Sequence, residues 1–382
     1  MGNAWYRSGQ VSGCRFPKPV IALVIAGYVL CVLSGCASEN LAENTTVNPL
    51  KYEDIQKTLE RDAKAGLIYS KDENIEASEA VIHAESVCRE EILNQPVYFA
   101  YDSLTESEQI WYRDINQILA NMQENQELSV EGLDVGLTED CIDKIFQCVL
   151  NDHPEYFFVD GYTYTWFTRW DQVVKLEFSG AYSISAKEAS KRSEEIEKAV
   201  TEIINGIAEG ASDYEKVKYV YETLICNTEY DMSAPDNQNI YSVFVNNRSV
   251  CQGYAKAAQY LLTRLGVECT LVVGTVENGD GHVWNLVKID DNYYHVDVTW
   301  GDVSYLMDNN WKAAQGSEEM YLPKISYDYL CVNTEQLLKT HVVGGVVPIP
   351  VCDSLEYNYF VQEGLYFTQV DQEKLAEVFA GA

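Results

Sequence analysis

A cysteine, a histidine and an aspartate in the second half of the chain could together carry nucleophilic chemistry. Cys251 begins an expected helix over residues 251–265. A thiol at a helix N-terminus feels the positive end of the helix dipole and unpaired backbone amides, and both favour the thiolate. A nucleophilic thiol also needs a base to hold its proton, and histidine suits that task near neutral pH. Cys251 is therefore the candidate nucleophile.

Three histidines follow this cysteine: His282, His295 and His341. His282 enters an expected strand directly after a turn. His295 lies two residues before Asp297 and therefore on the same strand face, whereas His341 lies beyond the strands and is the weakest candidate. An imidazole must also be oriented by an acceptor on its second nitrogen, and Asp297 on the neighbouring strand is placed to be that acceptor.

Three blocks of sequence resemble the signature of the transglutaminase-like superfamily, whose papain-like domains use a Cys-His-Asp triad. The blocks are Arg248-Ser249-Val250-Cys251-Gln252-Gly253-Tyr254-Ala255, His282-Val283-Trp284-Asn285 and Tyr294-His295-Val296-Asp297-Val298-Thr299-Trp300. Their order and spacing match as well, over about residues 210 to 340. By this resemblance Cys251 is the nucleophile, His282 the general base and acid, and Asp297 the residue that orients the imidazole.

The resemblance implies an enzyme, either a transglutaminase-like cysteine acyltransferase or a cysteine peptidase. The thiolate would attack an amide carbonyl of a protein or peptide, and water or an amine would resolve the resulting thioester. No cofactor and no metal is expected, since no loop has the ligand spacing of a calcium site. The alternative is a catalytically silent binding or scaffold module on the same fold, displayed at the cell surface. The intact Cys-His-Asp set argues against it.

Other residues near the three blocks are candidates for binding the substrate. The Cys251 backbone amide is the first expected donor to an oxyanion. The second donor is left open among Tyr241, Asn246, Asn247 and Gln252. The substrate-lining candidates are Gly253, Trp284 and Trp300. Gly253 would remove a side chain beside the sulfur, and the two tryptophans either pack around the triad or contact the substrate.

The elements that must position these residues predict an α+β fold. After a helix over 212–227, the helix 251–265 is followed by strands at 268–276, 282–289 and 293–299. Gly266 supplies a left-handed helix cap, and Asp290-Asp291-Asn292 forms a turn between antiparallel strands. The expected architecture is a papain/transglutaminase-like core, in which a central helix packs on an antiparallel sheet.

A helical and β-hairpin N-terminal region is expected to precede this core. Its predicted elements are helices at 51–65, 75–94, 106–122, 139–151 and 186–209, and a strand pair at 162–167 and 173–178. The chain is thus divided into a signal peptide (1–35), a tether (36–50), an N-terminal region (51–209), a transglutaminase-like domain (210–345) and a C-terminal β extension (346–382). The extension is inferred from strand-like runs at 357–361 and 365–367.

The N-terminus is expected to be a targeting segment. Basic residues precede an apolar run over 20–33, which is too short to span a membrane comfortably. The run ends in Leu33-Ser34-Gly35-Cys36, which resembles the lipobox of bacterial lipoproteins. This resemblance implies lipidation of Cys36 and a lipid-anchored protein on the extracytoplasmic face of the cell membrane. An uncleaved anchor that happens to end in a cysteine is the alternative.

Charge and cysteine content limit the partners. The 27 basic and 59 acidic residues give a net charge of -32, the wrong sign for nucleic acid. A protein or peptide substrate and the membrane are the expected partners, with the cell wall as a further candidate for the N-terminal half. The seven cysteines outside the signal, lipid and nucleophile positions are mainly interpreted as small buried hydrophobes, with no disulfide or metal site. They are Cys88, Cys141, Cys148, Cys226, Cys269, Cys331 and Cys352.

Overall fold

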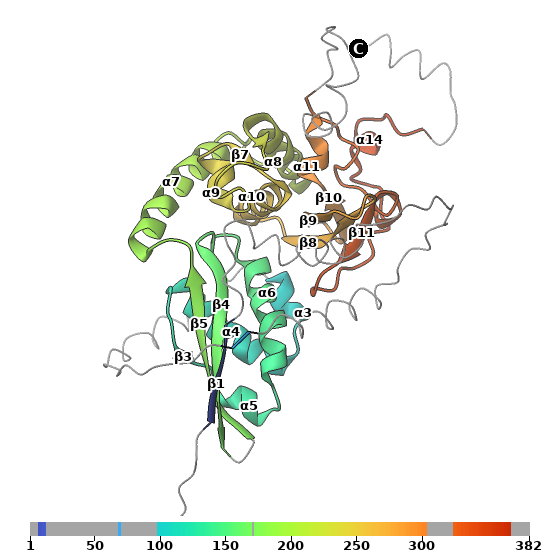
Figure 1. Ribbon diagram of the computed structural model, residues 1–382. Helices are drawn as coiled ribbons and strands as arrows, with labels where there is room; N and C mark the ends of the chain where they lie inside the picture. The colour runs from blue at the N-terminus through green and yellow to red at the C-terminus, as the bar shows by residue number, and fades with distance from the viewer. Residues whose placement is uncertain (1–6, 13–67, 70–97, 170–171, 304–323, 368–382) are drawn as a thin grey trace, which may run out of the picture. The chain divides into compact units, whose positions relative to one another are not determined.

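The computed structural model describes residues 7–12, 68–69, 98–169, 172–303 and 324–367 (Figure 1). The chain divides into two compact units, and the division falls after Ser190, within helix α7 (Ala186–Ile204). The sequence-based boundary lies instead after residue 209 and stays a prediction. The predicted helices at 51–65 and 75–94, the tether and the lipobox lie outside the described residues.

The first unit is built on an antiparallel sheet with the strand order β2-β1-β4-β5-β3. Its centre is the pair β4 (Val159–Arg169) and β5 (Gln172–Tyr182), in which Tyr164 lies opposite Phe178. This pair confirms the predicted strands. The other strands are β1 (Arg7–Ser12), β2 (Ile68–Tyr69) and β3 (Gln126–Glu127). β1 falls within the segment assigned to the signal peptide, an assignment that stays a prediction.

Helices complete the first unit. They are α3 (Phe99–Ser103), α4 (Glu106–Ala120), α5 (Val130–Asp134), the 3-10 turn η2 (Glu139–Cys141) and α6 (Ile142–Asp152). Helix α4 begins with the predicted capping box, since Thr105 Oγ1 accepts from the Glu108 amide and Glu108 accepts from the Thr105 amide. Trp111 of α4 and Ile145 of α6 are fully buried, and α4 packs against both α6 and β5.

The second unit contains an antiparallel sheet with the order β10-β9-β8-β11. Its strands are β8 (Cys269–Val276), β9 (Gly281–Ile289), β10 (Asn292–Val296) and β11 (His341–Gly344). The first three confirm the predicted strands, and Asp290 takes the left-handed conformation (φ 52°) in the predicted turn. Strand β11 was not predicted. It pairs with β8, where His341 lies opposite Val276.

Helix α10 (Cys251–Arg264) is the central helix of the second unit and packs against β8, β9 and α8 (Figure 1). Its Ala255 packs with Leu271 and Val283 of the sheet. The remaining elements are α8 (Asp213–Asn227), α9 (Ile240–Phe244), α11 (Val298–Gly301), α13 (Thr334–Leu337), α14 (Tyr359–Gln362) and the parallel strands β6 (Glu229–Tyr230) and β7 (Arg248–Ser249). This arrangement confirms the predicted α+β fold.

The structure corrects the predicted C-terminal β extension. The run 357–361 forms a turn and then α14, because the Asn358 side chain accepts from the Phe360 amide at 3.2 Å and begins a helix. Residues 365–367 form no strand. The β extension is therefore wrong over the described residues, which end at 367.

Two predicted element boundaries also move. Helix α7 ends at Ile204 and not near 209, and Gly210 then takes φ 77°. Strand β10 ends at Val296, because the Asp297 carboxylate accepts from the Trp300 amide at 3.1 Å and caps α11. Among the described helices, none combines the length and the hydropathy that crossing a membrane requires.

Candidate active site

Cys251 is the first residue of α10 and its side chain is half-buried. The residue before it, Val250, is the N-cap, and its apolar side chain leaves the first amides of the helix without the usual side-chain cap. The short parallel pair β6–β7 fixes the segment that leads into the helix, since the Asp231 amide donates to the Ser249 carbonyl at 2.8 Å. The fold therefore places a thiol at the positive end of a fixed helix dipole.

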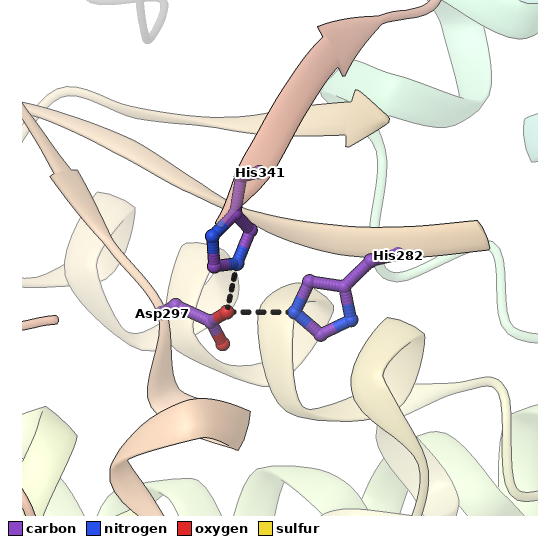
Figure 2. A group of neighbouring side chains, drawn as sticks. All are labelled: His282, Asp297 and His341. Carbon is purple, nitrogen blue, oxygen red and sulfur yellow. Dashed lines mark hydrogen bonds and ion pairs between the residues drawn. The ribbon is translucent and has the colours of Figure 1, made fainter. Parts of the chain in front are cut away.

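The sheet supplies a histidine and an acid beside that thiol. His282 lies on β9, Asp297 follows β10, and both side chains are buried. The distance from His282 Nε2 to Asp297 Oδ2 is 2.6 Å (Figure 2). The Cys251 side chain lies close enough to His282 to help raise the pKa of the imidazole. Three residues far apart in sequence thus lie together, and His282 and Asp297 form a buried hydrogen-bonded pair.

The electrostatics of these three residues favour a charged imidazole. Burial by itself lowers the pKa of His282, but the charge and hydrogen bond of Asp297 and the contact with Cys251 outweigh it and raise the pKa to about 10. Burial also opposes ionisation of Asp297, but the two histidines that contact its carboxylate hold its pKa far below the usual range. At neutral pH the pair is therefore an imidazolium and a carboxylate.

A second histidine contacts the same acid. His341 Nε2 lies 3.0 Å from Asp297 Oδ2, the oxygen that His282 also contacts (Figure 2). The sequence had made His341 the weakest of the three candidate histidines. The position of His341 depends on the pairing of β11 with β8, and no local sequence pattern predicts that pairing.

His295 does not contact Asp297, although its place in the sequence suggested a shared strand face. Its Nδ1 accepts from Trp284 Nε1 at 3.2 Å, and its Nε2 lies 3.3 Å from Thr334 Oγ1. Burial lowers the pKa of His295 to about 3. His295 is therefore a neutral imidazole that links two strands to α13.

The three substrate-lining candidates occupy different environments. Trp284 is fully buried and bonded to His295, which is a core position. At Gly253 a side chain would clash with Ser249 Oγ, so the glycine is required by packing within the domain. Trp300 is half-buried, with its ring 6.3 Å from that of His282. Its Nε1 is buried and has no hydrogen-bond partner among the residues that the structure describes.

The candidates for the second oxyanion donor differ in their burial and in their hydrogen bonds. The Tyr241 hydroxyl donates to Glu195 at 2.7 Å, so its proton is already committed. Asn247 takes the left-handed conformation (φ 55°) and is exposed. Asn246 is half-buried, and its backbone amide donates to the Tyr241 carbonyl at 3.3 Å. Gln252 is buried beside Cys251, and its Oε1 has no hydrogen-bond partner within the described part of the chain.

Comparison with known families agrees with this geometry. The core model of the transglutaminase-like superfamily matches residues 201–298. This chain carries a transglutaminase-like domain. The matched segment contains Cys251, His282 and Asp297, and it ends before His341.

Individual relatives of the transglutaminase-like domain are distant. Kyphoscoliosis peptidase of Mus musculus is 24% identical over 131 residues, which cover 30% of this chain and 20% of that protein. The alignment therefore spans about a fifth of the length of that relative.

Solved structures give weaker similarities. A crystal structure of a TGase has a TM-score of 0.26 and 14% identity, covering 42% of this chain and 46% of that chain. A candidate protease from Parabacteroides distasonis has a TM-score of 0.22 and 11% identity, covering 35% and 33%. The fold assignment rests on the geometry of the domain and the family match.

Proposed function

We propose that the transglutaminase-like domain catalyses cysteine-dependent acyl transfer on protein or peptide amides. The observation that carries the proposal is the buried, hydrogen-bonded pair of His282 and Asp297 beside Cys251 at the N-terminus of α10. An imidazolium beside a thiol stabilises the thiolate, which is the reactive form.

In the proposed reaction, the Cys251 sulfur attacks the amide carbonyl and forms a tetrahedral oxyanion. Uncapped amides at the start of α10 lie where they could stabilise that charge. The carbon–nitrogen bond breaks as His282 gives its proton to the leaving amine, and a thioester remains. Neutral His282 then takes a proton from water or from an acceptor amine, which attacks the thioester and releases the thiolate. Asp297 keeps the imidazole oriented throughout.

Hydrolysis and transamidation share the first half of this reaction. The mouse relative is named a peptidase, which supports hydrolysis as the first activity to test. The reaction is proposed to take place on the extracytoplasmic side of the membrane, with the protein anchored through lipid on Cys36. That part rests on the apolar run and the lipobox-like residues of the sequence.

The first test is the reactivity of Cys251 towards iodoacetamide as a function of pH, with each cysteine followed by mass spectrometry. Cys226 is exposed and serves as the internal comparator. We expect Cys251 to label about tenfold faster than Cys226 near pH ~6, well below the pH of about 8.5 at which an ordinary thiol ionises. His282→Ala should remove this advantage. Equal labelling of the two cysteines would favour the silent binding module.

The second test is turnover. Casein is incubated with a fluorescent primary amine, and both amine incorporation and peptide cleavage are measured. Cys251→Ala should abolish whichever activity the wild-type protein shows, because no thioester can form. Activity that survives this substitution would rule out the proposed nucleophile.

A further inference from the structure

His341 is a buried histidine that the proposed reaction does not use. It begins β11 at the edge of the sheet and is 1% exposed. Its Nε2 approaches Asp297 Oδ2 at 3.0 Å from a different strand than His282, as Figure 2 shows. Two imidazoles therefore converge on one oxygen of one carboxylate, and the proposed reaction uses only that of His282.

The surrounding hydrogen bonds assign the protons of His341. A carboxylate only accepts, so His341 Nε2 must carry the hydrogen that points at Asp297. In the neutral ring Nδ1 is then an acceptor, and Thr340 Oγ1 lies 2.9 Å from it. The Tyr329 hydroxyl lies 2.8 Å from the same Thr340 oxygen. When Thr340 donates to the imidazole and Tyr329 donates to Thr340, each hydrogen in the row has an acceptor.

We propose that His341 is a positioning residue that holds the carboxylate of Asp297 for His282. The inference rests on the proposed function. Asp297 Oδ1 accepts from the Trp300 amide at 3.1 Å, and Oδ2 accepts from both imidazoles. A buried carboxylate is stable only when its oxygens are satisfied. Removing His341 takes away one of the three donors, so the carboxylate of Asp297 is held less firmly and stabilises the His282 imidazolium less well.

The same three residues have ligand atoms within 4.8 Å of one another, a spacing that invites a metal interpretation. The observed contacts of 2.6 and 3.0 Å are hydrogen-bond distances. A metal bound at about 2.0 to 2.1 Å from each nitrogen and oxygen would push the ligand atoms further apart than the shorter contact. The geometry therefore favours a hydrogen-bonded positioning network.

Several groups around His341 must be considered when pH is the readout. The titratable groups that face it are His282, Asp297, His295 and Tyr329. The rings of Trp284 and Trp300 lie 5.1 and 4.7 Å from its ring. His295 is an equally buried histidine that does not contact Asp297, so it provides the matched control.

The experiment measures the pH profile of iodoacetamide labelling at Cys251 in the full chain. His341→Phe keeps a ring and loses the donor, whereas His341→Gln retains an amide N–H that reaches the position of Nε2. We expect His341→Phe to slow labelling near pH ~6 about tenfold, equivalent to about one pH unit or about 1.4 kcal/mol. His341→Gln should restore most of the rate, and His295→Gln should leave the profile unchanged.

Two results would overturn the inference: a folded His341→Phe protein with the wild-type profile, or a His341→Gln protein as impaired as His341→Phe. If circular dichroism shows that His341→Phe does not fold, Thr340→Val takes its place. That variant keeps the histidine and removes the hydroxyl that fixes its tautomer, and we expect labelling to slow about threefold. An unchanged rate in Thr340→Val would equally overturn the inference.

The result separates this inference from the proposed function. Wild-type Cys251 with the reactivity of Cys226 would remove the proposed function itself. An activated wild-type Cys251 that is insensitive to His341 would remove only the positioning role.

Discussion

At the residue scale, Asp297 contributes both to the structure of the domain and to its proposed chemistry. It is 1% exposed and accepts from His282, His341 and the Trp300 amide. These donors come from β9, β11 and α11, so one carboxylate joins three elements. The same residue caps α11 and raises the pKa of His282, which means that structure and chemistry depend on one side chain.

Replacing Asp297 by asparagine tests whether the charge of its carboxylate raises the pKa of His282. Asparagine keeps the shape and loses the charge, so only the contact with Cys251 still opposes the effect of burial, and the pKa of His282 falls. We expect a neutral His282 near pH 7 and at least a tenfold (~1.4 kcal/mol) slower labelling of Cys251 at about pH 6. Labelling as fast as in the wild-type protein would show that Asp297 does not set the charge of His282.

The pair of His282 and Asp297 should also make the stability of the protein depend on pH. The pKa of His282 is raised to about 10 in the folded protein, against about 6.5 in the unfolded chain. The stabilisation by its charge is therefore fully present below about pH 6.5 and is lost as the pH rises towards about 10. We expect the wild-type melting temperature to fall across this window, and to fall less in Asp297→Asn. Parallel melting curves for the two proteins would contradict the assignment.

At the element scale, the N-terminus of α10 is built by packing as much as by helix propensity. Ser249 Oγ donates to the Asn237 carbonyl at 2.8 Å and lies 2.7 Å from Ser242 Oγ. This buried serine occupies the space that a side chain at Gly253 would need. The start of the helix is therefore fixed against the loop before it, and the thiol is fixed with it.

Gly253→Ala should destabilise the protein by about 1 to 3 kcal/mol, because the new methyl group overpacks a buried polar contact. Urea unfolding gives the free energy. Ser249→Gly removes the clashing hydroxyl, so the double variant should be less destabilised than the sum of the two single variants. Additive effects would mean that the serine does not determine the need for glycine.

At the scale of the whole molecule, the net charge of -32 limits the partners that we propose. An excess of acidic side chains repels phosphate backbones, so nucleic acid is not proposed as a partner, and proteins, peptides and the membrane stay predicted partners. Cys36 lies outside the described residues, so the anchor remains an inference from sequence. Four of the cysteines within the domains are buried with raised pKa values: Cys148, Cys269, Cys331 and Cys352.

Lipid anchoring predicts the outcome of a fractionation experiment. In a bacterial host, Cys36→Ala should abolish the lipid mass on the N-terminal peptide and move the processed protein out of the membrane fraction, since no thioether can form at alanine. Cys31→Ala, within the apolar run, should behave as the wild-type protein does. Equal membrane binding and equal mass in the Cys36→Ala protein would exclude lipidation at this site.

The sequence by itself determined the local features. The capping boxes at Thr105 and Ser212 and the turn at Asp290 lie where the residue types require them, because each depends on contacts within a few residues. The order of a cysteine at a helix start, a histidine on a strand and an aspartate on the next strand likewise came from local patterns. The central helix on an antiparallel sheet followed from that order.

The tertiary structure alone decided the contacts between distant residues. His341 reaches Asp297 across 44 residues because β11 pairs with β8, and strand pairing at that distance leaves no local signal. The short helix α14 replaced a predicted strand for a local reason, since a single asparagine cap outweighed the β propensity of aromatic residues. The row of candidate catalytic groups was thus readable in the sequence, whereas its support by a second histidine exists only in the folded sheet.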